Sequence, residues 1–474
     1  MTKAEAITLY QSGLEPTVTK LLELAAENEQ LQQQLRELLT SVLPAENTKE
    51  ADPARPSAMT PAYEKPSSKG KRRKTPGRKK GHVGVRRKKP DHIDQVKEHK
   101  LECCPDCHAS LRGKHACETR SRYTEDIPQT RSLVIEHRIY RYYCRVCDKM
   151  VEAPVTDALP NSTIGLYTLV FTAWLHYGLG IATTKITRIL NTAAQFKVTE
   201  SGLFQAWYRL AEILKSVYND IGQQAKASAV LNADETGWRV NGETYWLHCL
   251  CNQVLAYFGI ERSRGSPAIK KLLGEFFRGI LISDFWGGYN FIKALAKQKC
   301  LVHLFRELVK TSLINATAPW CAFSKKLTRL LRDAIRLRSK TDELEPQVFE
   351  KRKARLKRRL QALINSDHQD KDCRRLVKRL RRHQNELLTF LDYPEVDWHN
   401  NHVERQLRSS VVARKNSGGN HSDRGAETQA VMMTIFFTLA LRDQDEVNTV
   451  VQMVEAYLKN GKTPEFRDKT PSNG

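Results

Sequence analysis

The 474-residue chain has 77 Lys and Arg against 53 Asp and Glu, a net charge of +24, and 40% hydrophobic residues. This length allows two to four domains with a sizeable core, and the charge favours a polyanionic partner, nucleic acid before an acidic membrane surface. The first ten residues lack a signal peptide. The apolar run 430–441 is too short to span a bilayer, which needs roughly 20 residues. We therefore expect a soluble, intracellular protein with no membrane partner.

The N-terminal 95 residues combine a heptad pattern with a basic linker. Leucines recur with one Asn at heptad spacing over residues 21–42, which predicts a short coiled coil within residues 1–43; a helix packed on its own domain is the alternative. Residues 44–95 are poor in apolar residues and predict a disordered linker. Its basic run would neutralise DNA phosphates without reading sequence, unless it is only a solvated tail. The DNA-binding candidates here are Lys71, Arg72, Arg73, Arg78 and Lys79.

Two Cys-x-x-Cys pairs lie in residues 96–155 of a chain with eleven cysteines. Two facing pairs supply four thiolates for tetrahedral Zn²⁺, which predicts a zinc-ribbon-like domain with a structural zinc ion. Alternating apolar residues at 133–140 predict a hairpin that brings the pairs together. Redox chemistry from one pair is the alternative. The predicted ligands are Cys104, Cys107, Cys144 and Cys147, with Cys103, Cys117 and His108 as substitutes.

Two further regions are predicted to be helical. Residues 183–190 and 198–207, within the helical segment 156–226, resemble a helix-turn-helix whose second helix Thr199 or Ser201 would cap. Reading DNA and plain core packing are both open for this pair. Residues 307–392 carry leucines at helical spacing among many Lys and Arg, which predicts a basic helical insertion. Its outer face would grip a DNA flank or form a solvated strut.

Three acidic residues are the candidate catalytic and Mg²⁺-binding residues: Asp234, Asp284 and Glu404. Each Asp ends an apolar, strand-like run, and Glu404 lies near the start of a predicted helix. A lone Asp in such a place is more often a turn residue, so the prediction rests on the three together. Two strand carboxylates and one helix carboxylate can hold two Mg²⁺ or Mn²⁺ ions, which clamp an in-line phosphoryl displacement.

The order of elements in residues 227–306 predicts the fold of this core. Three antiparallel strands, a helix and a further strand are expected of an RNase H-like core, with Asp234 and Asp284 on neighbouring strands. The predicted chain is thus a multidomain α+β/α protein whose RNase H-like core the helical insertion interrupts. Its segments are 1–43, coiled coil; 44–95, basic linker; 96–155, zinc-binding domain; 156–226, helical region; 227–306, first part of the core; 307–392, insertion; 393–474, second part of the core with closing helices.

Basic residues follow Glu404 on its predicted helix. Arg405, Arg408, Arg414 and Lys415 are predicted to bind DNA phosphates. The alternative is an ordinary surface ion pair between Glu404 and Arg408, which are four residues apart and share a helix face. His303 is predicted to be a packed core histidine rather than a catalytic one.

The chain resembles the IS66 family of bacterial insertion-sequence transposases over most of its length. The order of the coiled coil, basic linker, zinc domain and interrupted core is that of the family. The chain departs from it at Leu301, where an aromatic residue is usual, and at Glu307, where a second Arg is usual. The matching segments are Asp234-Glu235-Thr236, Ser283-Asp284 with Tyr289, Cys300 with His303 and Arg306, Asn401 with Glu404-Arg405 and Leu407-Arg408, and Arg414-Lys415-Asn416.

The resemblance implies a DDE transposase in which Asp234, Asp284 and Glu404 form the catalytic triad. It would bind the ends of its element, cut DNA in a metal-dependent reaction and transfer the freed 3′-OH to target DNA. We also expect a homo-oligomer on DNA, small accessory proteins of the same element as partners, and a place in the bacterial cytoplasm at the nucleoid. The alternatives are an inactive, transposase-derived DNA-binding protein and a metal-dependent nuclease that does not join strands.

Overall fold

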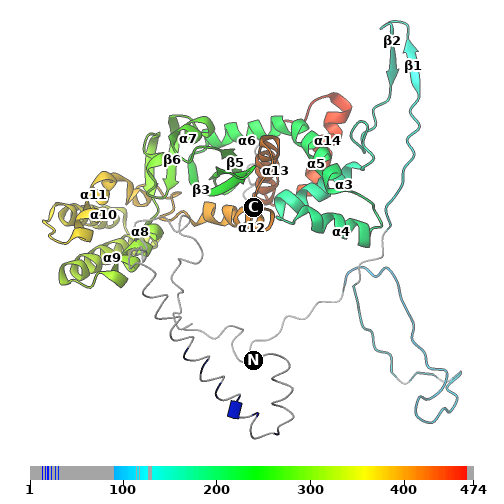
Figure 1. Cartoon of the computed structure of the whole chain (residues 1–474), viewed down its shortest axis with the longest axis horizontal. Coiled ribbons are helices and arrows are strands. Elements are labelled where there is room, and N and C mark those ends of the chain that lie inside the picture. Colours follow the sequence, from blue (N-terminus) through cyan, green and yellow to red (C-terminus); the bar gives the residue numbers. More distant parts are fainter. Residues whose placement is uncertain are drawn as a thin grey trace. The chain divides into compact units, whose positions relative to one another are not determined.

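The computed structural model describes residues 90–113, 115–116, 118–125 and 131–466, with a few single residues between 13 and 30 (Figure 1). The seam of the predicted coiled coil, the basic run of the linker and Cys117 lie outside these residues, so the predictions made for them stay predictions. The chain divides into two units, Met1–Ser67 with Val309–Ile314, and Ser68–Leu308 with Asn315–Gly474. The second unit contains the candidate site.

A five-stranded mixed sheet forms the centre of the second unit. The strands β3, β4 and β5 form an antiparallel meander, and β6 pairs parallel with β3 and with β7. The meander, the helix α7 (Ser266–Leu272) and β6 follow the predicted order, whereas β7 escapes prediction because lysines obscure its apolar pattern. In sheet order the strands are β5 (Ala256–Glu261), β4 (Glu243–Cys251), β3 (Val230–Val240), β6 (Phe276–Ser283) and β7 (Lys293–Lys299).

Helices cover both faces of the parallel part of the sheet, which explains why β3 and β6 read as apolar runs. Side chains alternate between the faces of a strand. On one face, Leu231, Ala233 and Leu281 join a core with helices from residues 166–227 and from the C-terminal region. On the other face, Ile280 and Ile282 pack with the helices of the insertion. The central strands are therefore held rigidly from both sides.

The helical region before the sheet has the two helices expected of the predicted pair. Thr199 is the N-cap of α5 and its side chain accepts the N–H of Gly202, so Thr199, not Ser201, caps this helix. Ile186 and Trp207 are completely buried, and both belong to the main core. The elements are α3 (Leu166–Ala173), the π-helix η2 (Trp174–Gly178), α4 (Thr183–Ala193), α5 (Glu200–Ile213) and α6 (Lys215–Ala227).

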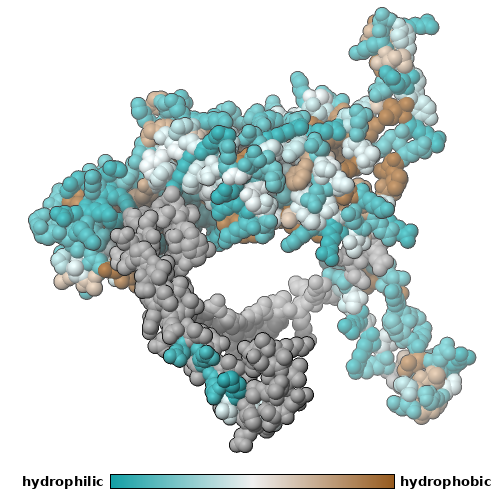
Figure 2. All heavy atoms as spheres, in the orientation of Figure 1, coloured by the Kyte–Doolittle hydropathy of each residue, from teal (hydrophilic) through white to brown (hydrophobic). Residues whose placement is uncertain are grey.

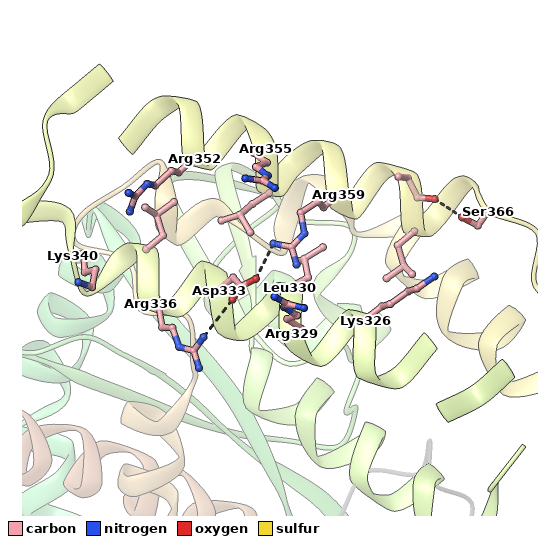
Figure 3. Close-up of a pocket in the computed structure, with 14 residues that line it drawn as sticks. Lys326, Arg329, Leu330, Asp333, Arg336, Lys340, Arg352, Arg355, Arg359 and Ser366 are labelled. Atoms are coloured by element: carbon pink, nitrogen blue, oxygen red, sulfur yellow. Dashed lines mark hydrogen bonds and ion pairs between the residues drawn. The ribbon is translucent and has the colours of Figure 1, made fainter. Parts of the chain in front are cut away.

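Helices also form the region after β7. The helices α9 and α10 of the insertion pack side by side with a groove between them (Figure 3), and hydrophilic residues dominate the visible surface of α10 and α11 (Figure 2). Among the described helices, none combines the length and the apolar character needed to cross a membrane. The helices are α8 (Leu301–Ile314), α9 (Ala318–Arg338), α10 (Pro346–Asn365), α11 (Lys371–Arg382), α12 (Asn401–Ser417), α13 (Asp423–Leu441) and α14 (Glu446–Asn460), with short 3₁₀ turns η4 (Thr341–Glu343), η5 (Gln384–Glu386) and η6 (Thr389–Leu391).

The hairpin of the cysteine-containing segment differs from the prediction. It consists of β1 (Arg141–Cys144) and β2 (Lys149–Glu152), which pair antiparallel around the second Cys-x-x-Cys turn. Residues 133–140, predicted to form the hairpin, are not in a strand. Asp148 adopts a positive φ of 51° directly after Cys147, and this left-handed residue closes the turn that joins β1 to β2.

Candidate active site

The parallel pairing of β3 and β6 sets Asp234 beside Asp284. The last paired residues are Ala233 and Ser283, and each precedes one of the two Asp residues. Asp234 lies inside β3, which continues to Val240 against β4, and not at the strand end that its sequence context indicates. Asp284 is buried and Asp234 half-buried. The site therefore lies where β6 ends, and the carboxyl ends of parallel strands are where ligands bind in sheets of this kind.

The helix α12 carries Glu404 to the face of β3 on which Asp234 lies. Asp234 and Trp238 share a face because side chains alternate along a strand. Val403 of α12 packs in the same buried cluster as Trp238. The far end of α12 is anchored as well, since the Trp238 indole N–H donates to Asn420 Oδ1 at 2.7 Å and the Asn420 N–H donates to the Arg239 carbonyl at 2.9 Å.

Gly419 makes this anchor sterically feasible. Its φ is 113°, and a Cβ at this position would lie 2.3 Å from the carbonyl oxygen of Arg239. Only glycine adopts such a conformation readily and allows such a close approach. Gly419 therefore allows the chain that follows α12 to return to the end of β3.

Asn400, the residue before α12, connects three elements of the site. Its side-chain N–H donates to the Ala233 carbonyl and its Oδ1 accepts from the Asn232 side chain, both at 2.9 Å. Its backbone N–H donates to Cys300 Sγ at 3.2 Å, and the Cys300 N–H donates to the Ser283 carbonyl at 2.8 Å. Asn400 is completely buried. The residues that precede Asp234 and Asp284 are thus tied to the starts of α8 and α12.

Negative charge accumulates at this site. Burial raises the pKa of Asp234 well above its usual range, and the neighbouring charges of Glu235, Asp284 and Glu404 raise it further. Like charges near one another favour the protonated form, so Asp284 and Glu404 both lie near enough to Asp234 to affect its protonation. An arrangement that concentrates carboxylates in a partly buried place is suited to binding a cation.

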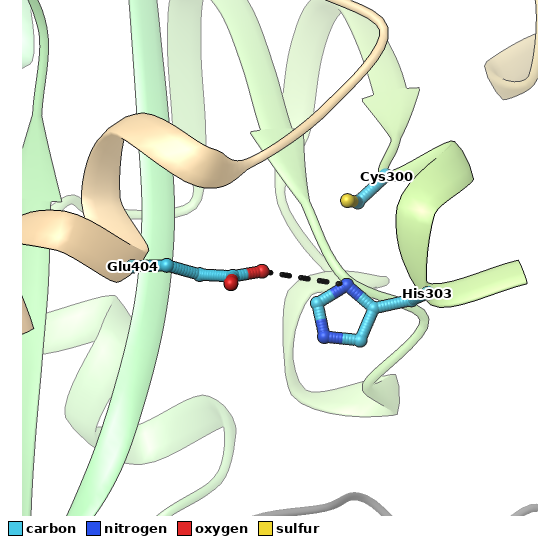
Figure 4. A group of neighbouring side chains, drawn as sticks. All are labelled: Cys300, His303 and Glu404. Atoms are coloured by element: carbon cyan, nitrogen blue, oxygen red, sulfur yellow. Dashed lines mark ion pairs between the residues drawn. The ribbon is translucent and has the colours of Figure 1, made fainter. Parts of the chain in front are cut away.

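Glu404 also faces His303 of α8 (Figure 4). Glu404 Oε1 lies 3.9 Å from His303 Nδ1, and both atoms are buried without a hydrogen-bond partner. Arg306 lies 3.6 Å from Glu404 Oε2. Among the described residues these are the basic partners of Glu404, so the alternative ion pair with Arg408 does not form.

Cys300 completes a group of three neighbouring ligand types. Its Sγ, a ring nitrogen of His303 and a carboxylate oxygen of Glu404 all lie within 4.8 Å of one another. The three acids of the predicted triad do not form such a group within the described part of the chain. Burial raises the pKa of Cys300 to about 11, so its sulfur is a neutral thiol. The structure places His303 at the site, where sequence reasoning treats it as a core histidine.

Glu235 occupies the opposite face of β3 and braces the segment after Asp284. Its carboxylate lies 2.8 Å from the Arg264 guanidinium and accepts the Tyr289 hydroxyl at 2.5 Å. Arg264 stacks between Trp246 and Trp286, 4.7 and 4.0 Å from the ring centres. The backbone N–H of Trp286 donates to Asp284 Oδ1 at 2.8 Å. Glu235 and Tyr289 both lie in segments that match the family, but the sequence analysis predicts no role for either residue.

Lys299 supports the end of β6 from the neighbouring strand. Its ammonium donates to Ser283 Oγ at 3.0 Å and to the Asp284 carbonyl at 2.9 Å, and the side chain is completely buried. Burial lowers its pKa. A Lys at the end of a lysine-rich segment gives no sign in the sequence that it is buried, and only the pairing of β6 with β7 reveals it.

The predicted phosphate-binding residues of α12 divide into two groups. Arg405, Arg408 and Lys415 are exposed and therefore accessible to a polyanion. Arg414 donates to the Gly237 carbonyl of β3, and burial lowers its pKa. Its contact is with the sheet, so it contributes to the anchoring of α12.

The two Cys-x-x-Cys segments form similar turns. Backbone N–H groups of Cys107 and Asp106 lower the pKa of Cys104, and those of Cys147 and Val146 lower the pKa of Cys144. A residue with positive φ follows each pair, His108 and Asp148. Within the described residues the four sulfurs are not gathered into one group of ligands, so the zinc ion remains a prediction.

Comparison with known proteins places this site in a family context. The profile of the transposase IS66 family matches residues 162–428, more than half of the chain and every acid of the site. The uncharacterized protein y4hP of Sinorhizobium fredii (strain NBRC 101917 / NGR234) is 24% identical over 470 residues, covering 88% of this chain and 79% of the relative. The uncharacterized protein y4jD of the same strain is 22% identical over 413 residues, covering 79% of each.

Proposed function

Because this chain belongs to the IS66 family of transposases, we propose that it is a DDE enzyme that cuts DNA at the ends of its element and joins the freed ends to target DNA. The observation that supports the proposal is that Asp234 has Asp284 beside it and Glu404 near enough for both carboxylates to raise its pKa. The register of β3 and β6 aligns the first two, and the charge of the third reaches Asp234.

The donor set fits Mg²⁺ or Mn²⁺. Both ions prefer oxygen ligands, and mutually repelling carboxylates need a cation. The buried oxygen of Glu404 that accepts no hydrogen bond is a further atom that could ligate a metal ion. Asp234 and Asp284 would both bind the two ions, and Glu404 would be a further ligand of one of them. When bound, two such ions stabilise the attacking and leaving oxygens of an in-line displacement.

The chain's own residues position these carboxylates and bind the substrate. Asn400 and Lys299 hold the backbone beside Asp234 and Asp284, and Glu235 restrains the segment after Asp284. Arg306, half-exposed beside Glu404, would donate charge-assisted hydrogen bonds to a phosphate at the scissile bond. The exposed Arg405, Arg408 and Lys415 would continue this phosphate contact along α12. No covalent protein–DNA intermediate is required.

The remaining regions would recognise the ends of the element. We propose an RNase H-like architecture for the core, since an antiparallel meander, a helix and a parallel strand carry the two Asp residues. The similar turns of the two cysteine pairs support one structural zinc ion held by Cys104, Cys107, Cys144 and Cys147. The basic linker and residues 156–226 would contact end DNA. Homo-oligomer formation on DNA, accessory proteins and nucleoid association complete the proposal.

The test uses the purified full chain, Mg²⁺ or Mn²⁺, labelled duplexes with the native element ends and a plasmid target. Asp234→Asn and Glu404→Gln are compared with Glu212→Gln, which alters an exposed carboxylate paired with Arg424. We expect joined products from the native chain and from the control, and none from the two site variants. Cleavage without joining would instead indicate a nuclease. Binding without cleavage, unchanged by either site substitution, would leave a DNA-binding protein.

A further inference from the structure

A basic groove runs between α9 and α10 of the helical insertion (Figure 3). Its volume is about 990 Å³. The α9 side contributes Lys326, Arg329, Leu330, Asp333, Arg336, Leu337 and, just beyond the helix, Lys340. The α10 side contributes Arg352, Arg355, Leu356, Arg359, Ala362, Leu363 and, just beyond it, Ser366. These positions recur at spacings of three and four residues, which places them along one side of each helix.

The groove has an apolar floor and a charged rim. Leu330, Leu337, Leu356 and Leu363 are buried in the core that the insertion shares with β6. Seven Lys and Arg residues line the groove and most of them are exposed, whereas Asp333 is its only carboxylate. Because the floor is part of a packed core, the charged side chains extend from a rigid base.

Four of the seven positive charges of the groove are not neutralised by an ion pair with any described residue. Asp333 pairs with Arg359 at 2.8 Å and with Arg336 at 3.5 Å. Of the five other basic residues of the groove, Lys340 pairs with Glu343 at 3.3 Å, whereas Lys326, Arg329, Arg352 and Arg355 have no ion pair with any described residue. Elsewhere in the insertion some basic residues do find partners: Arg375 and Arg379 pair with Glu307 of α8, and Lys353 and Lys357 pair with Asp392. Two cations without an ion pair therefore line the groove from each helix, Lys326 and Arg329 from α9 and Arg352 and Arg355 from α10.

We infer that this groove binds the phosphate backbone of duplex DNA next to the site of cleavage. Eleven residue steps along either helix give the groove a length of about 17 Å, over which one strand of B-form DNA presents about five phosphates. Such a contact fixes the position of the duplex without reading its sequence. The inference rests on the proposed action on DNA and assigns the insertion a place in it.

The groove lacks features that would select a small anion or an acidic peptide instead. Its basic side chains are distributed along an open seam and do not converge on one point. The leucines beneath them are buried and offer no apolar surface to a peptide side chain. Arginine forks suit phosphate oxygens, which they can contact in pairs. The rim arginines from the two helices can therefore follow a backbone that passes between them.

The experiment measures binding of the full chain to a duplex that extends beyond the native element end, in EDTA, across a range of salt concentrations. The groove variant carries Arg329→Gln, Arg352→Gln and Arg355→Gln. The matched control carries Arg358→Gln, Arg374→Gln and Arg382→Gln, which remove the same charge from exposed positions of the insertion outside the groove. We expect the groove variant to lose about 0.9 from the log–log salt slope for each phosphate contact removed, and the control to keep the native slope.

Two outcomes would overturn the inference: a native slope in the groove variant, or equal losses in groove variant and control, which would indicate only a diffuse positive field. Circular dichroism verifies folding, and single Arg329→Gln and Arg352→Gln variants, each with a loss near 0.9, serve if the triple variant unfolds. The binding assay needs no catalysis. A native chain that binds in the groove but never cleaves DNA would contradict the proposed function and still support this inference.

Discussion

Replacing Asn400 by Ala tests whether the buried contacts of one side chain hold the site together. The substitution removes two hydrogen bonds from the core, one accepted by the Ala233 carbonyl and one donated by the Asn232 side chain. A buried polar group that loses its partner costs about 1–3 kcal/mol, so the free energy of unfolding should fall by about 2–6 kcal/mol. Total stabilities of about 5–15 kcal/mol are usual, and the loss is therefore a large fraction.

Urea unfolding followed by tryptophan fluorescence measures this loss, because Trp238 lies in the cluster that contains α12. The control is Asn460→Ala, an exposed Asn at the end of α14, for which a change within about 0.5 kcal/mol is expected. At a temperature where the variant remains folded, DNA cleavage should fall by about 10²-fold, the effect of a displacement near 1 Å. An Asn400→Ala variant as stable and as active as the control would refute the reasoning.

Three further predictions concern the surroundings of the site, its charge and the zinc domain. Glu235→Gln replaces the buried carboxylate that pairs with the Arg264 guanidinium by a neutral amide and should lower the free energy of unfolding in urea by about 3–5 kcal/mol. Glu243→Gln, which breaks an exposed pair, should change it by less than about 1 kcal/mol. Equal effects of the two substitutions would contradict the prediction. Folding raises the pKa of Asp234 above its ordinary value of 3.8, so the folded chain binds this proton more tightly than the unfolded chain and, in EDTA, its stability should fall as the pH rises from 3.8 through the raised pKa. Asp234→Asn should remove that dependence and stabilise the chain at pH 7 by about 1.4 kcal/mol per pKa unit, and a lower melting temperature than the native chain in EDTA would refute this. Elemental analysis should find one zinc ion per chain, and this ion should be absent from the Cys104→Ala and Cys144→Ala variants. The control Cys321→Ala, which alters an exposed cysteine of α9, should retain it. Zinc retained by all three variants would contradict the assignment.

Local sequence patterns were sufficient for much of the fold. Apolar runs and turn residues predict the meander and β6, and leucine spacing predicts the helices of the insertion, because these signals depend on which face of an element is buried. Thr199 could be named as one of two caps from its side chain alone. The predicted hairpin at 133–140 was wrong because alternation does not reveal where a turn closes. Asp148, with its left-handed backbone, places the hairpin eight residues later.

The sequence by itself determined the chemistry available to this protein: three carboxylates in strand and helix contexts, two cysteine pairs and a large excess of positive charge. The tertiary structure decided which of these groups meet. Asn400, Lys299 and His303 take their places at the site only when α8, α12 and the β6–β7 pair pack together, since the partners named for them lie 15 to 168 residues away in the chain. The groove likewise exists only once α9 and α10 pack. Local sequence encodes the preferences of single elements, whereas contacts between elements follow from how their buried faces fit, and no short pattern records that fit.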